Sequence, residues 1–198
     1  MRRGRARFGF RWSPLAVAAL LLLVILDREG IGSAALLAAL VHECGHLLAV
    51  RLLSLSRCEM RLDFLGARLR TEGRLLSYGE EWLLAAAGPL FSLSASAVAG
   101  LFLSHSYFLY VFAASSLLLG LFNLLPVRTL DGGRMLELLL ERCFGTRVAV
   151  ATLAVTSFAS LFLLWALAVY LLLRVGDGLS LLCFSMGLFT RFLRGEEL

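Results

Sequence analysis

Long apolar segments, separated by short polar or charged connections, make up most of the chain. A helix that crosses a bilayer needs about 20 apolar residues, and most of the segments approach or exceed that length. The first and last are shorter. The segments are 14–26, 31–55, 82–103, 107–125, 148–173 and 179–192. This pattern predicts an all-α polytopic membrane protein with about six transmembrane helices.

The connection between the second and third segments has a different pattern. In the stretch from Cys58 to Leu76, Met60 and Leu62 alternate with Arg61 and Asp63. Alternation with a period of two favours a small β-hairpin at the membrane surface, whose edge could hold an unwound substrate by strand addition. A solvated basic loop that touches lipid headgroups is the alternative.

Composition supports the membrane interpretation. Hydrophobic residues make up 60% of the 198 and charged residues only 17%, which is unusual for a soluble domain. A chain of this size has room for one membrane-embedded domain, so we expect residues 1–198 to form a single domain. The four cysteines show no paired spacing, and no disulfide framework is indicated.

Arginine supplies all of the basic side chains, and its distribution predicts the orientation. Two of the 19, Arg28 and Arg174, fall in odd-numbered connections, whereas the other seventeen lie before the first segment, in or around even-numbered connections, or at the end of the chain. The positive-inside rule then places both termini in the cytoplasm of a multi-pass cell-membrane protein. The net charge of +5 therefore reflects topology and contact with the lipid bilayer, and we expect no nucleic-acid partner.

The second apolar segment contains His42-Glu43-Cys44-Gly45-His46, an HExxH motif. Residues four apart lie on one helix face, so both imidazoles can reach one metal ion such as Zn²⁺. Glu43 lies about 100° further round the helix, where it could act as general base on a water molecule. Alternatively, the motif occurs by chance and the histidines are buried hydrogen-bonding groups. Ionisable residues at membrane depth are usually functional, which favours the metal site.

A second polar cluster, Asn123 to Gly133, ends the fourth segment. Pro126 interrupts the helix, and the freed backbone suits a cavity more than lipid. A zinc hydrolase usually has three protein ligands, and Asp131 is the candidate third. Asp131 could also be the N-cap of an amphipathic helix over 132–144. Asn123 could also join two membrane helices by hydrogen bonding.

The chain resembles the site-2 proteases, a family of zinc intramembrane metalloproteases. The resemblance rests on HECGH at 42–46, the Asn-x-x-Pro and Leu-Asp-Gly-Gly elements within 123–133, and Ala-Gly-Pro at 87–89. It covers a core of about 31–145. Within the third segment, Gly88-Pro89 either lets another backbone pack closely or simply kinks the helix.

The resemblance implies roles for individual residues. His42, His46 and Asp131 would bind one Zn²⁺, and Glu43 would be the catalytic base. Asn123 would be a second catalytic residue that positions the substrate or stabilises the oxyanion. Ser92 stands where many family members have asparagine. This difference removes no metal ligand, and it concerns the positioning of the substrate more than the activity.

The implied function is hydrolysis of a peptide bond in or near the transmembrane segment of a membrane protein. The site would face the cytoplasm, and cleavage would release a cytoplasmic regulator. The small size resembles the sporulation-type branch, whose substrate is a sigma-factor precursor. Expected partners are a transmembrane or membrane-tethered protein substrate and regulatory membrane proteins.

Two other functions remain open on the sequence. One is a different membrane metalloprotease that takes its third ligand from Glu59, Glu72 or Glu80. The other is a non-proteolytic membrane scaffold or binding protein that retains a zinc site.

Overall fold

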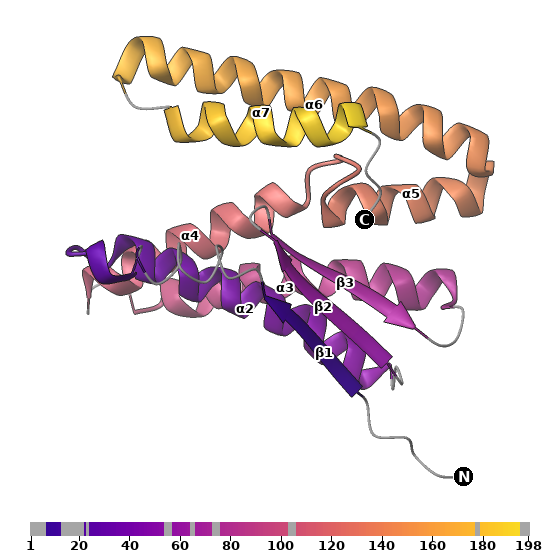
Figure 1. Ribbon diagram of the computed structural model, residues 1–198, viewed down its shortest axis with the longest axis horizontal. Coiled ribbons are helices and arrows are strands. Elements are labelled where there is room, and N and C mark those ends of the chain that lie inside the picture. Colours follow the sequence, from indigo (N-terminus) through magenta and orange to yellow (C-terminus); the bar gives the residue numbers. More distant parts are fainter. Residues whose placement is uncertain are drawn as a thin grey trace. The chain divides into compact units, whose positions relative to one another are not determined.

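A computed structural model describes most of the chain. The described residues are 7–12, 22, 24–53, 57–63, 66–72, 76–102, 106–176 and 179–194. They form helices α2 to α7 and strands β1 to β3 (Figure 1). The chain divides into two compact units, Met1–Phe122 and Asn123–Leu198, and each is described by itself.

The first unit contains a three-stranded sheet in the order β1-β2-β3 (Figure 1). Strands β2 (Arg57–Asp63) and β3 (Gly66–Glu72) are antiparallel neighbours, with Met60 opposite Leu69. Strand β1 (Arg7–Trp12) pairs in parallel with β2. The sequence interpretation treated residues 7–12 only as a basic flank, so β1 is an addition from the structure. Parallel pairing requires a long connection, which here includes α2.

Helix α2 (Ile31–Leu52) carries the HExxH motif. Its N-terminus has no side-chain cap at Gly30, whose φ of 77° lies in the left-handed region. Instead, the Asp27 carboxylate accepts a hydrogen bond from the Ser33 N–H at 2.7 Å. Hydrogen bonds from the Ser33 side chain and backbone lower the pKa of Asp27, as expected for an anion at a helix N-terminus.

Helix α3 (Tyr78–Gly100) begins with a capping box. The Glu80 N–H donates to Ser77 Oγ, and the Ser77 N–H donates to the Glu80 carboxylate. The helix continues through Pro89 and packs against α2. Their contact is close because a Cβ atom on Gly45 would lie 2.6 Å from the Ala87 carbonyl oxygen.

Helix α4 (Tyr107–Asn123) packs on α3 through small residues. A Cβ atom on Gly120 would lie 3.1 Å from the Ser92 Cβ, and the Ser96 hydroxyl donates to the Ala113 carbonyl at 2.8 Å. The Ser96 hydroxyl, a polar group between two apolar helices, is thereby satisfied within the protein.

The second unit contains α5 (Asp131–Phe144), α6 (Thr146–Val175) and α7 (Leu179–Arg194). Helix α6 contacts both of the others, and α6 and α7 lie side by side in Figure 1. Gly145, with φ of 83°, makes the single-residue turn from α5 to α6. Glycine suits this conformation because it has no Cβ to clash with the backbone.

The loop after Pro126 is held to α6 and to the start of α5. Ser157 of α6 accepts a hydrogen bond from the Arg128 N–H at 2.9 Å and donates to the Pro126 carbonyl at 3.5 Å. Added Cβ atoms on Gly132 and Gly133 would overlap the backbone of Leu124 and Val127. The two glycines therefore allow the loop to fold back over the first turn of α5.

Three described helices, α2, α3 and the Thr146–Arg174 part of α6, are long and apolar enough to cross a membrane. Helix α4 and the Leu181–Thr190 part of α7 are apolar but shorter. Most of the expected first segment, 14–26, lies outside the described residues. The count of six spans is therefore not supported by the described helices.

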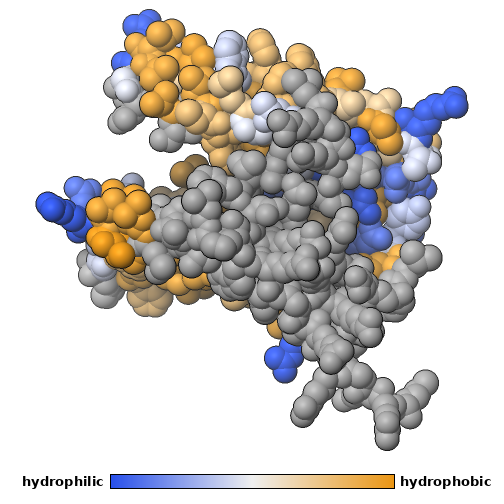
Figure 2. All heavy atoms as spheres, viewed as in Figure 1, coloured by the Kyte–Doolittle hydropathy of each residue, from blue (hydrophilic) through white to orange (hydrophobic). Residues whose placement is uncertain are grey.

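Hydrophobic side chains cover much of the helical surface visible in Figure 2. Leu118 and Leu163 are each 67% exposed, and Leu173 is 79% exposed. Such exposure of large apolar side chains is costly in water and normal in lipid. The apolar helices thus suggest a membrane protein.

Candidate metal centre

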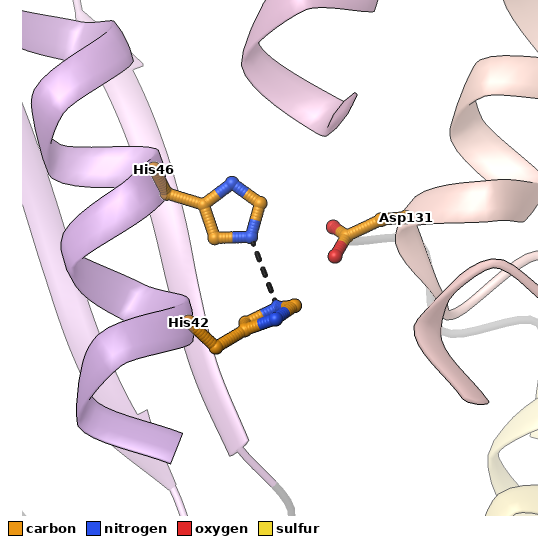
Figure 3. A group of neighbouring side chains, drawn as sticks. All are labelled: His42, His46 and Asp131. Carbon is orange, nitrogen blue, oxygen red and sulfur yellow. Dashed lines mark hydrogen bonds between the residues drawn. The ribbon is translucent and has the colours of Figure 1, made fainter. Parts of the chain in front are cut away.

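The two histidines of the HExxH motif lie one turn apart on α2 and point toward a common place. Their Nε2 atoms are 3.3 Å apart, and the ring centroids are separated by 5.0 Å. Figure 3 shows this convergence, with the dashed line between the two Nε2 atoms. His42 is buried at 5% exposure, and His46 is half-buried.

Both Nδ1 atoms are held by α3. His46 Nδ1 lies 2.9 Å from the Leu84 carbonyl oxygen, and His42 Nδ1 lies 2.9 Å from Ser92 Oγ. A carbonyl can only accept, so His46 Nδ1 carries the hydrogen and donates it. In the neutral imidazole this leaves the Nε2 lone pair of His46 available to a metal ion.

Gly88 leaves space beside the two Nε2 atoms. A Cβ atom there would lie 2.7 Å from His42 Nε2 and would overlap His46 Nε2. The close neighbours of Gly88 are thus imidazole side chains, whereas the sequence interpretation expected another backbone or a simple kink there. The contact shows why this turn of α3 has no side chain at that position.

Glu43 and Asn123 have different local settings. Glu43 is half-buried on α2, directly after His42 in the chain. Asn123 is the last residue of α4 and is also half-buried. Both residues take part in interactions within the protein.

Asp131 is the first residue of α5, and the N-cap is Leu130. The interpretation of Asp131 as N-cap is therefore wrong by one position, because the chain turns into the helix at Leu130. An acidic residue in the first turn still interacts favourably with the helix dipole. Of the alternative ligands, Glu80 is used in the capping box of α3, and Glu59 and Glu72 belong to the sheet.

His42 and His46 of the first unit and Asp131 of the second are side chains of the types that bind metal ions, and they are the candidate ligands among the described residues. Two imidazole nitrogens and one carboxylate oxygen match the three-ligand sets of hydrolytic zinc sites.

The contacts of Ser92 and Leu84 with the histidines were not predicted. Ser92 was expected to influence substrate positioning, whereas its hydroxyl touches His42. A signal was available in the spacing, since Leu84, Gly88 and Ser92 are four residues apart and share one face of α3. His42 and His46 are also four residues apart. This face of α3 can therefore lie along the face of α2 that carries them.

Comparisons with known proteins found similarity to a peptidase family and to a solved site-2 protease. The model of Peptidase family M50 matches residues 95–167, a stretch that contains Asn123 and Asp131 but not the HExxH motif. Among solved structures, the chain is similar to a site-2 protease from Methanocaldococcus jannaschii, with a TM-score of 0.63 and 19% identity. That match covers 96% of this chain and 92% of the other, and it shows a shared fold. No curated protein sequence matches.

The match to the family model supports a metalloendopeptidase. Peptidase family M50 also implies a metal, for which the His42, His46 and Asp131 group is the candidate site. The apolar helices are consistent with action on membrane proteins within a bilayer.

Proposed function

We propose that the protein is an intramembrane zinc metalloprotease that hydrolyses a peptide bond in or near the transmembrane segment of a membrane protein. The observation that carries the proposal is the convergence of two Nε2 atoms at 3.3 Å, on a helix apolar enough to cross a bilayer. Nδ1 of each ring has a polar partner on α3, so the Nε2 atoms of both rings can offer their lone pairs to one metal ion.

Asp131 is proposed as the third ligand of one Zn²⁺. The donor set supports zinc, and the position of Asp131 at the start of a helix leaves its carboxylate on a rigid element. A zinc ion held there would polarise the scissile carbonyl and would lower the pKa of bound water to about 7.

Glu43 is proposed as the general base. Its carboxylate takes a proton from the attacking water and delivers it to the leaving amine, so that one side chain serves both steps. Asn123 is proposed to donate an amide hydrogen bond, either to the substrate or to the charge that develops on the carbonyl oxygen.

The orientation and substrate are also proposals. The arginine distribution supports about six membrane segments, with both termini and the active site toward the cytoplasm. Cleavage on that side would release a cytoplasmic regulator. A sigma-factor precursor is the substrate that the resemblance to the sporulation-type branch implies.

Substitution of Glu43 tests the proposed reaction. We expect the wild-type protein, reconstituted in liposomes with a library of labelled single-span peptides, to cleave some of them. Glu43→Gln should lower that rate by at least about 100-fold, because the base is lost, while zinc content stays the same. Peptide cleavage is measured by mass spectrometry, which also gives the cleaved bond.

Cys44→Ser provides the control. Cys44 is the exposed neighbour of Glu43, and this variant should cleave like the wild type. Cleavage by Glu43→Gln at the wild-type rate would contradict the proposed mechanism. A wild-type protein that holds zinc but cleaves no peptide would favour the scaffold function instead.

A further inference from the structure

Ser92 is the polar side chain of α3 that reaches the candidate metal site. It is fully buried, and its Oγ lies 2.9 Å from His42 Nδ1. A second polar contact from α3 to the histidines comes from the backbone, at the Leu84 carbonyl. Of these two contacts, the one made by Ser92 comes from a side chain, so a substitution can remove it.

A metal ion on His42 Nε2 fixes what Nδ1 must do. A neutral imidazole has one hydrogen, and if Nε2 gives its lone pair to a metal, the hydrogen is on Nδ1. A buried Nδ1–H needs an acceptor, and Ser92 Oγ lies at the right distance to be that acceptor.

Without a metal, the same hydroxyl can take the opposite role. His46 Nε2 carries no hydrogen, because His46 Nδ1 donates to the Leu84 carbonyl. The 3.3 Å contact between the two Nε2 atoms is then a hydrogen bond only if His42 Nε2–H donates. In that tautomer His42 Nδ1 accepts, and the Ser92 O–H can rotate to donate to it.

Close packing fixes the place of Ser92. Glycine at position 120 of α4 lies against the Ser92 Cβ, and an added Cβ there would approach it to 3.1 Å. The hydroxyl therefore stays beside His42 while its hydrogen turns. A group that both donates and accepts can hold the ring in one orientation in the two tautomers.

We propose that Ser92 is the positioning residue for His42, and that its hydroxyl keeps Nε2 directed toward the metal by accepting the Nδ1–H. This inference rests on the proposed zinc site. It assigns Ser92 a role in metal binding, distinct from the substrate positioning expected from the sequence.

The first test is the affinity for zinc of the purified full-length protein, measured by competition with a chelator. Ser92→Ala should weaken zinc binding by about 10- to 100-fold, the usual effect of removing a group that orients a metal ligand. The matched control is Ser96→Ala on the same helix, which removes the hydrogen bond to the Ala113 carbonyl. Ser96→Ala should bind zinc like the wild type.

The second test needs no variant at position 92. The chain has three histidines, so nitrogen-15 NMR of the zinc-loaded wild type with labelled histidine can resolve each ring. We expect His42 with hydrogen on Nδ1 and with a proton shift that marks a hydrogen bond. This readout remains decisive even if Ser92→Ala does not fold.

The outcomes separate the two proposals. Unchanged zinc affinity in Ser92→Ala, or an unprotonated His42 Nδ1 in the zinc-loaded protein, overturns the role of Ser92 and leaves the zinc site intact. A wild-type protein that binds no zinc, or a His42→Ala/His46→Ala variant that binds it normally, overturns both.

Discussion

At the scale of single residues, the lack of a side chain at Gly88 leaves space beside the two imidazoles. Gly88 lies against both Nε2 atoms, and any Cβ there would occupy the space beside them. We expect Gly88→Ala to lose most of its zinc, because the rings would have to turn away or α3 would have to shift.

Zinc content of the purified variant measures this effect, and α3 supplies the control. Gly100 is on the same helix, and an added Cβ there would meet nothing within 4 Å. Gly100→Ala should therefore keep full zinc content. Normal zinc content in Gly88→Ala would show that the ion is not held at the Nε2 atoms.

The residue scale also shows what could be predicted from the sequence. His42 and His46 were predicted to converge, and this is confirmed because a helix alone brings residues four apart to one face. The contact between Ser92 and His42 was not predicted, because it depends on how two helices rotate against each other. The roles of Glu43, Asn123 and Asp131 stay predictions.

At the scale of elements, the loop between Pro126 and α5 depends on a single hydroxyl of α6. Ser157 is fully buried and bonds to the backbone at both Arg128 and Pro126. Ser157→Ala should destabilise the protein by about 1–2 kcal/mol, because the half-buried Arg128 N–H loses its acceptor.

Hydrogen–deuterium exchange should then rise over residues 124–130. Thr156→Ala is the control, because the Thr156 hydroxyl donates within its own helix to the Leu153 carbonyl. Equal exchange in the two variants would argue against Ser157 as the anchor of this loop. The loop precedes Asp131, so its position matters to the proposed site.

Helices were easier to predict than strands. The helix expected over 132–144 begins at Asp131 and ends at Phe144, since glycine at position 145 ends it in a conformation that favours glycine. Strand β1 was not predicted, because its pairing with β2 depends on residues about 50 positions away.

At the scale of the whole molecule, hydropathy gives the class of protein more securely than the number of spans. Three described helices are long and apolar enough to cross a membrane, whereas α4 and the apolar part of α7 are shorter. Hydropathy shows that these segments are apolar, but a span also needs about 20 residues of continuous helix. The arginine distribution remains the basis for the proposed orientation.

The zinc content of ligand variants tests the central claim most directly. We expect one zinc ion per chain in the purified wild-type protein, and little or none in His42→Ala/His46→Ala or in Asp131→Ala. Glu141→Ala, which removes another acidic side chain of α5, should retain the ion. Full zinc content and unchanged affinity in Asp131→Ala, or in the double histidine variant, would contradict the account.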